Sequence, residues 1–161
     1  MISYLAIVIF IIAVTRAFAY WGIYFLKAGE IPVINGVLHL TYVENTGAAF
    51  GIFKNSTAML SIVGIILFII ITYIVASRKN LGIYTKILLA CLAGGGISNV
   101  CDRISFGFVV DYINFCLIDY PVFNVADICV VVSCVLIAVK IIMTDSDKGR
   151  EVNAVGNNDS N

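Results

Sequence analysis

The stretch TAMLSIVGIILFIIITYIVA, residues 57–76, decides the fold class of this chain. It contains no Asp, Glu, Lys or Arg. A helix of about 20 residues rises about 30 Å, which is the thickness of the hydrocarbon core of a bilayer. Helices suit this environment because lipid offers no partner for an unpaired backbone group. The stretch therefore predicts a transmembrane helix.

Three further apolar runs accompany this stretch, at residues 2–26, 83–102 and 122–143, and each holds at most two charged residues. Over all 161 residues, 61% are hydrophobic and 12% are charged, and the mean hydropathy is +1.02. Soluble domains are roughly half apolar and a quarter charged. We therefore predict an all-α membrane protein in which residues 1–143 form one domain with four transmembrane helices. Residues 144–161 are polar, and we expect them to form a disordered cytoplasmic tail.

Composition argues against two other classes of protein. The net charge is zero and no run of basic residues is present, so nucleic-acid binding is not supported. The single histidine, His39, and the lack of a CxxC pair argue against a zinc site or a cysteine–histidine nucleophile. We interpret the five cysteines as small buried apolar residues, and we expect neither a metal nor a cofactor.

The first apolar run has two interpretations. Ala17-Phe18-Ala19 imitates the cleavage site of a secretory signal peptide. However, no positive charge precedes the apolar part, Arg16 lies just before the supposed cut, and apolar residues continue beyond it. We therefore favour a retained first helix.

The distribution of basic residues orients the spans, because cytoplasmic loops are enriched in Lys and Arg. Basic residues lie between the second and third runs or just inside the third (Arg78, Lys79 and Lys86), and at or beyond the end of the fourth (Lys140, Lys148 and Arg150). We predict that this side is cytoplasmic, together with both termini. The loops at about 27–56 and 102–121 then face outward. Within the first of them, strand-prone residues flank Asn35-Gly36, which predicts a β-hairpin.

Two carboxylates lie near the outer ends of the predicted spans. Asp127 lies about five residues inside the fourth run, and Asp111 lies in the second outer loop. An ionisable group at a membrane is costly and often marks a functional site. Two carboxylates in one apolar site tend to share a proton, so that one can activate water while the other polarises a carbonyl. The spacing alone leaves open that Asp111 faces solvent in a loop and that Asp127 snorkels from a helix end.

Four motifs accompany these aspartates in chain order: NTGAAFG (45–51), GGGISNVCDR (94–103), VVDY (109–112) and FNVAD (123–127). Three of them place an asparagine at the outer edge of a predicted helix. Together with four spans, this ordered set resembles the lipoprotein signal peptidase family, also called signal peptidase II. The resemblance extends over nearly the whole chain, up to about Met143.

The resemblance implies an aspartic endopeptidase in the bacterial cytoplasmic membrane, with a small β-sheet on the outer side. Asp111 and Asp127 match the catalytic aspartates. The polar residues that hold the substrate backbone or orient the aspartates match Asn45, Asn99, Arg103 and Asn124. Asp102 matches the acidic partner before that arginine. The substrate would be a prolipoprotein cleaved just before a diacylglyceryl-modified cysteine. Membrane lipids would be partners, globomycin an inhibitor, and the enzyme a monomer.

The chain departs from the family pattern at two places. The first helix of the family usually carries an aspartate and, four residues later, a lysine, where this chain has Thr15 and Ala19. Losing both partners leaves no uncompensated charge, so it is milder than losing one. Ser98 stands where the family often has glycine. Gly94-Gly95-Gly96 predicts close helix packing.

Two other functions remain open on sequence grounds. One is a small transporter that uses Asp127 as a proton-coupled carboxylate, although few polar residues continue below it in the second and fourth runs. The other is a catalytically silent relative that binds lipoproteins, with Thr15 and Ala19 as marks of decay.

Overall fold

The computed structural model describes residues 1–48, 52–78 and 80–158, and side chains up to Thr144. In this part of the chain, four helices are long and apolar enough to cross a membrane: Ile2–Leu26, Thr57–Ser77, Ile83–Phe106 and Val125–Thr144. The predicted membrane fold is confirmed. The third helix extends beyond the predicted residue 102 to Phe106, and it ends where Gly107 takes a left-handed conformation with φ of +85°. The fourth begins three residues later than predicted, because Phe123 pairs with Ile113 of the neighbouring strand.

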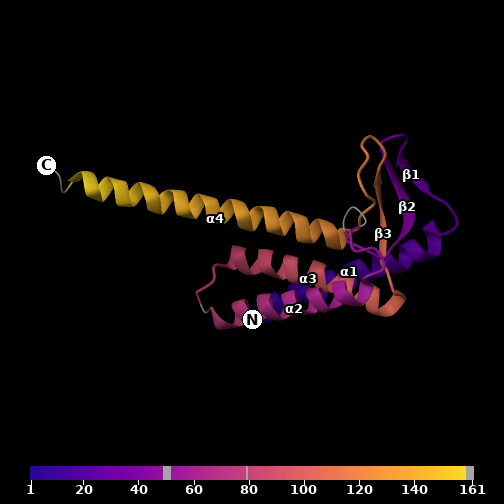
Figure 1. The fold of residues 1–161 in the computed structure, drawn as a ribbon, viewed down its shortest axis with the longest axis horizontal. Coiled ribbons are helices and arrows are strands. Elements are labelled where there is room, and N and C mark those ends of the chain that lie inside the picture. Colours follow the sequence, from indigo (N-terminus) through magenta and orange to yellow (C-terminus); the bar gives the residue numbers. More distant parts are fainter. Residues whose placement is uncertain (49–51, 79, 159–161) are drawn as a thin grey trace.

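The helix in the middle of the bundle is α3 (Ile83–Phe106), which packs against three others. These are α1 (Ile2–Trp21), α2 (Thr57–Ser77) and α4 (Val125–Asn158). A π-helical turn, η1 (Gly22–Leu26), continues α1. In Figure 1, α4 projects beyond the other helices at its carboxyl end. Side chains after Thr144 lie outside the described part, so the disorder expected for residues 144–161 stays a prediction.

Glycines allow the helices to approach α3 closely. A Cβ atom on Gly95 would lie 2.5 Å from the carbonyl oxygen of Ala126 on α4, and one on Gly94 would lie 3.1 Å from the Ile11 side chain on α1. A Cβ atom on Gly64 of α2 would meet Val100 of α3 at 2.4 Å. Lipid provides no hydrophobic force between helices, so small residues that permit close packing stabilise such interfaces. This agrees with the packing role predicted for the glycine run.

A three-stranded antiparallel sheet lies at one end of the bundle (Figure 1). Its strands, in the order β1-β2-β3, are Ile31–Ile34, Leu38–Asn45 and Val109–Phe115. The first two form the predicted hairpin, and Gly36 in its turn has φ of +70°, a left-handed conformation that favours glycine. The third strand pairs Asp111 with Val43. The sheet thus brings the second outer loop against the first.

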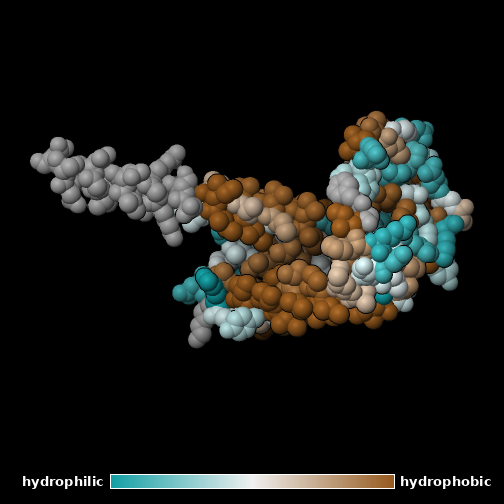
Figure 2. Space-filling view, viewed as in Figure 1, coloured by the Kyte–Doolittle hydropathy of each residue, from teal (hydrophilic) through white to brown (hydrophobic). Residues whose placement is uncertain are grey.

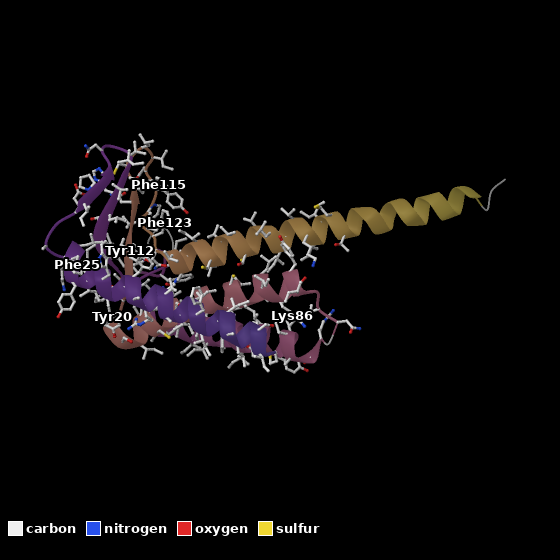
Figure 3. The ribbon with its side chains drawn as sticks, turned by 180° about the vertical axis from the view of Figure 1, so that it is seen from behind. Tyr20, Phe25, Lys86, Tyr112, Phe115 and Phe123 are labelled. Atoms are coloured by element: carbon white, nitrogen blue, oxygen red, sulfur yellow. The ribbon has the colours of Figure 1, made fainter. Side chains whose placement is uncertain are left out.

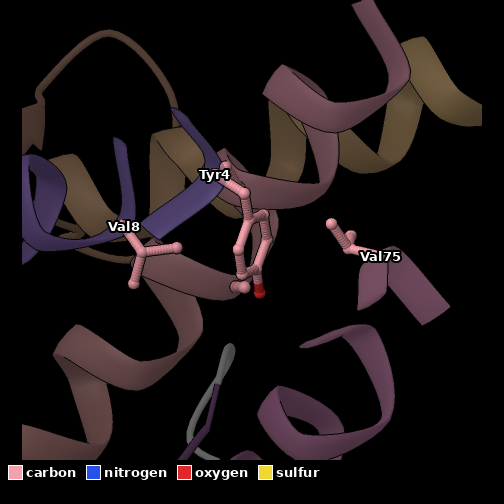
Figure 4. Close-up of a cluster of buried hydrophobic side chains, with 5 residues drawn as sticks. Tyr4, Val8 and Val75 are labelled. Atoms are coloured by element: carbon pink, nitrogen blue, oxygen red, sulfur yellow. The ribbon is translucent and has the colours of Figure 1, made fainter. Parts of the chain in front are cut away.

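The surface matches a membrane environment. Figure 2 shows a hydrophobic band over the helices, with hydrophilic residues gathered at the sheet end and at the opposite end. In α2, only 6% of the most apolar window is buried, so most of its side chains face outward. The interior near the far end contains Tyr4, Val8 and Val75, and Figure 4 shows Tyr4 between the two valines. The Tyr4 hydroxyl lies 2.9 Å from Thr72 Oγ1, which satisfies this polar group.

Candidate active site

The first turn of α4 positions Asp127 through a reciprocal contact with Asn124. The Asn124 backbone N–H donates to Asp127 Oδ2 (3.1 Å), and the Asp127 backbone N–H donates to Asn124 Oδ1 (3.0 Å). This is the geometry of a capping box, in which two side chains satisfy the unpaired N–H groups at a helix start. The local sequence N-x-x-D therefore begins the helix and fixes both side chains.

Asp111 lies on β3 with 1% of its surface exposed. Its Oδ1 accepts a hydrogen bond from Asn124 Nδ2 and its Oδ2 accepts one from Asn45 Nδ2, both at 2.8 Å. Asn45 is the last residue of β2, so the pairing of β2 with β3 brings it beside the carboxyl. Burial and the neighbouring charge of Asp127 raise the pKa of Asp111 to about 7.

Asn99 on α3 completes the connection between the two carboxyls. Its Nδ2 donates to Asp127 Oδ1 at 2.7 Å, and its Oδ1 accepts from Asn124 Nδ2 at 3.2 Å. The amides of Asn99 and Asn124 thus join Asp111 and Asp127 in one hydrogen-bonded cluster. The structure therefore brings together the two predicted aspartates and three predicted asparagines.

Arg103 connects α3 to the loop after β2. Its Nη2 donates to the Gly47 carbonyl oxygen at 2.8 Å, while the Gly47 N–H donates to Asn45 Oδ1 at 2.9 Å. Among the described side chains, Arg103 Nε is a buried donor without a partner. Such a donor is costly unless something binds it. Residues 49–51 of the predicted motif lie outside the described part of the chain.

A pocket of about 540 Å³ opens over this cluster. Its polar lining includes Asn45, Asn99, Arg103, Asp111 and Asp127. The rest of its wall is largely apolar, with Val43, Val109, Val122, Phe123, Val130 and Val131. Among the described residues, no group of three or more His, Cys, Asp or Glu side chains could hold a metal ion.

Two predicted residues lie behind the pocket instead of in its wall. Asn124 is 4% exposed and contacts both aspartates from the interior, so its place suits orientation of the carboxyls more than contact with a substrate. Asp102 is 5% exposed, and its ion-pair partner is Arg16 of α1 instead of the adjacent Arg103. Its Oδ2 accepts the Val110 N–H at 3.1 Å.

Arg16 is the polar residue that sequence reasoning missed, since we considered it only as a flank of a supposed cleavage site. The signal was present, because Arg16 is the one charged residue of the first span and needs a partner there. Thr15 and Ala19, which carry no charge, are buried, with 7% and 3% of their surfaces exposed. Among the described residues, the ion beside them is Asp102, which is paired with Arg16.

Comparison with known proteins assigns the family. The sequence profile of signal peptidase (SPase) II matches residues 5–143. The chain belongs to the signal peptidase II family. It is therefore a membrane peptidase, as predicted.

Similar members of the signal peptidase II family come from clostridia. The lipoprotein signal peptidase of Clostridium acetobutylicum is 40% identical over 146 residues, which cover 88% of this chain and 94% of that protein. That of Clostridioides difficile is 36% identical over 144 residues, which cover 89% of this chain and 97% of the relative.

Two solved structures, each described as a bacterial membrane enzyme determined by the in meso method, share the fold. The one at 2.3 Å resolution has a TM-score of 0.85 at 26% identity and covers 92% of both chains. The one at 1.9 Å resolution has a TM-score of 0.78 at 26% identity and covers 88% of this chain and 93% of the other.

Proposed function

We propose that this signal peptidase II removes the signal peptide from diacylglyceryl-modified prolipoproteins, using Asp111 and Asp127 to activate water. Its relatives are named lipoprotein signal peptidase. The observation that carries the catalytic part is the cluster in which Asn124 and Asn99 join the two buried carboxyls. Such a cluster lies on the floor of a pocket large enough for a peptide segment.

The protonation of the pair supports acid–base roles. With a pKa of about 7, Asp111 holds a proton at lower pH, while Asp127 acts as the charged partner. Asp127 takes a proton from water as the water oxygen attacks the scissile carbonyl carbon. Asp111 donates its proton to the carbonyl oxygen. The roles then alternate, so that a proton reaches the leaving amine and the C–N bond breaks. The products are a new carboxyl group and the free amine of the lipid-bearing cysteine.

Two donors at the pocket are suited to hold an extended substrate backbone. Arg103 Nε is buried and has no hydrogen-bond partner among the described residues, and a peptide carbonyl would satisfy it. Asn45 lies on the lining and donates to Asp111, so it contacts both the carboxyl and the space above it. Asn99 also lines the pocket and donates to Asp127, while Asn124 and Asp102 act as supports behind the lining.

The apolar wall supports a lipid-modified substrate. Val130 and Val131 belong to the membrane span of α4 and line the same pocket as the carboxyls. Acyl chains beside the scissile bond would contact this wall and the surrounding membrane lipids. The enzyme then cuts at the membrane edge, as a monomer that globomycin inhibits.

Charge placement supports the orientation. Figure 3 shows Lys86 at one end of the bundle and Phe115 and Phe123 near the sheet at the other. Lys140 donates a hydrogen bond to Thr85, next to Lys86, so two basic residues share that end. On the positive-inside rule this end is cytoplasmic, and both termini with it. The carboxyl pair then works at the outer face of the bacterial cytoplasmic membrane.

The test compares the parent with Asp111→Asn and Asp127→Asn on a diacylglyceryl-modified prolipoprotein in detergent. Each substitution should lower cleavage about 10²- to 10⁴-fold, the usual contribution of a general acid or base. Asp119→Asn is the matched control, because Asp119 is exposed in the segment after β3. Unchanged cleavage by either dyad variant would refute the mechanism.

Two further arms test the substrate and the competing function. The same prolipoprotein without the diacylglyceryl group should remain uncut, and globomycin should block cleavage of the modified form. Failure of the folded parent to cleave the modified substrate would favour a catalytically silent relative that binds lipoproteins.

A further inference from the structure

Arg16 is the one residue among Asp, Glu, Lys and Arg in the first span, Ile2–Leu26. The Arg16 side chain is 16% exposed and forms an ion pair with Asp102, which is buried. A charge within a span is costly and persists where a partner and a role keep it. Among the described residues, Arg16 contacts none that line the substrate pocket. Any role of Arg16 in the reaction therefore passes through Asp102.

The Arg16 guanidinium is held in one orientation. Its Nη1 donates to Asp102 Oδ1, and its Nη2 donates to the Tyr20 hydroxyl at 3.2 Å. Its Cζ lies 5.0 Å from the centre of the Tyr20 ring and 4.7 Å from that of Phe106. A planar guanidinium group can make these hydrogen bonds and ring contacts at the same time, whereas the single ammonium group of lysine cannot.

The second oxygen of Asp102 contacts the strand that carries Asp111. Asp102 Oδ2 accepts the backbone N–H of Val110 at 3.1 Å, and Val110 is fully buried. The next residue in the chain is Asp111. A continuous set of polar contacts therefore runs from α1 through the end of α3 to the backbone of β3.

We propose that Arg16 is a positioning residue for the peptidase reaction, because it holds Asp102 as a charged acceptor for the Val110 N–H and so fixes the Asp111 carboxyl near Asp127. This inference rests on the proposed function, in which Asp111 is catalytic. Arg16 itself touches neither the pocket nor the reacting atoms. Its effect should thus fall on kcat and on the titration of the carboxyl pair more than on KM.

The experiment uses the full chain in detergent and measures kcat, KM and the pH profile of kcat on the diacylglyceryl-modified prolipoprotein. Arg16→Met should lower kcat about 10- to 100-fold, the cost of a misplaced catalytic group, and displace the alkaline limb of the pH profile. Arg16→Lys should fall between this variant and the parent. Arg16→Met with Asp102→Asn should recover most of the loss, because an amide oxygen still accepts the Val110 N–H and no charge is left alone.

Lys27→Met is the matched control. Lys27 forms an exposed pair with Glu44 at 3.8 Å, on the same side of the bundle, and its loss should leave kcat and the pH profile unchanged. A parental kcat and pH profile in Arg16→Met, with only a lowered melting temperature, would overturn the proposal in favour of a simple anchor between α1 and α3. A double variant no more active than Arg16→Met would overturn it too.

Two further comparisons keep the outcome decisive. Where Arg16→Met does not accumulate as folded protein, Arg16→Lys decides alone, and a parental kcat and pH profile in it overturns the proposal. Asp111→Asn and Asp127→Asn in the same assay distinguish a failure of the proposed mechanism from a failure of the positioning role of Arg16. Active aspartate variants refute the proposed mechanism, whereas inactive aspartate variants beside fully active Arg16 variants refute only the positioning role.

Discussion

The Thr15 hydroxyl donates a hydrogen bond to the Ser98 hydroxyl across 2.8 Å, between α1 and α3. Both side chains are buried, and Ser98 Oγ in turn donates to the Gly94 carbonyl oxygen at 2.7 Å. Two of the three positions at which the sequence departs from the family pattern, Thr15 and Ser98, are therefore in contact. A neutral pair of hydroxyls joins the helices there, while Arg16 supplies the positive charge beside Asp102.

Restoring the family pair with Thr15→Asp and Ala19→Lys should harm this chain. Thr15, Ala19 and Asp102 line a cavity of about 10 Å³, which holds no more than about one water molecule. A lysine there would be overpacked and would compete with Arg16 for Asp102, at a cost of about 1–3 kcal/mol of stability. Thermal unfolding in detergent measures the change, with Thr15→Ser as the control that keeps the hydroxyl. A higher melting temperature together with faster cleavage would contradict this account.

Adding one methyl group to Gly95 should move α4 and with it Asp127. The new Cβ would lie 2.5 Å from the Ala126 carbonyl oxygen, next to the catalytic candidate. We expect Gly95→Ala to lose about 1–3 kcal/mol of stability and most of its cleavage activity.

The neighbouring Gly96 provides the control for that substitution, because a Cβ there would meet no atom within 4 Å. Gly96→Ala should leave cleavage intact and even stabilise the helix slightly, since alanine favours helix more than glycine. Equal effects of the two substitutions on melting temperature and cleavage would show that helix spacing at Gly95 is unimportant.

Cleavage should fall as the pH rises through about 7. Burial and the charge of Asp127 on α4 raise the pKa of Asp111, whereas Asn45, Asn124 and Arg103 lower it. Since the pKa is raised to about 7, Asp111 is protonated below that pH and ionises above it. The mechanism needs one protonated carboxyl, so kcat should be lost on the alkaline side. A pH profile of kcat tests this, and a flat profile between pH 6 and 9 would contradict it.

Removing the Asn45 amide should move this alkaline limb of the pH profile to higher pH. Its Nδ2 donates to Asp111 Oδ2 at 2.8 Å and stabilises the charged form, so Asn45→Leu should raise the pKa of Asp111 further. Asn114→Ala, at an asparagine on β3, the strand that carries Asp111, should leave the alkaline limb in place. A downward shift in Asn45→Leu would show that the amide does not act on Asp111 as the geometry indicates.

Asn124→Ala should impair both the helix start and the reaction. The substitution removes the acceptor of the Asp127 N–H and the donor to Asp111, and loss of such a cap costs about 1 kcal/mol. We expect a lower melting temperature and a cleavage rate reduced well beyond that effect, with KM little changed. Asn80→Ala, at an exposed asparagine between α2 and α3, is the control. A raised KM with normal kcat would instead support direct contact between Asn124 and the substrate.

The sequence allowed the spans to be predicted because hydropathy alone determines which segments lipid accepts. The sequence also allowed Asp111 and Asp127 to be predicted on the same side of the membrane, since four crossings leave few possible topologies. The hairpin followed from Asn35-Gly36, whose turn chemistry is local. These features depend on residues close together in the chain.

Long-range contacts could not be derived in the same way. The bond between Asn45 and Asp111 joins residues 66 positions apart and depends on the register of β2 and β3, which no local pattern specifies. The ion pair of Arg16 with Asp102 joins residues 86 apart, and Arg103 offered a nearer candidate in sequence. The start of α4 at Val125 instead of residue 122 reflects pairing of Phe123 with Ile113, again a tertiary effect.

The place of Asp127 on α4, the last of the four described spans, has a consequence for how the enzyme is made. Ribosomes synthesise α1, α2, α3 and β3 first, so Arg103, Asn99 and Asp111 enter the membrane before their partner exists. Only docking of α4 on the glycines of α3 brings Asp127 to Asn99. On the proposed mechanism a half-inserted chain has only Asp111 of the two catalytic aspartates and cannot hydrolyse a peptide bond, so the protease becomes active only when its own assembly is complete.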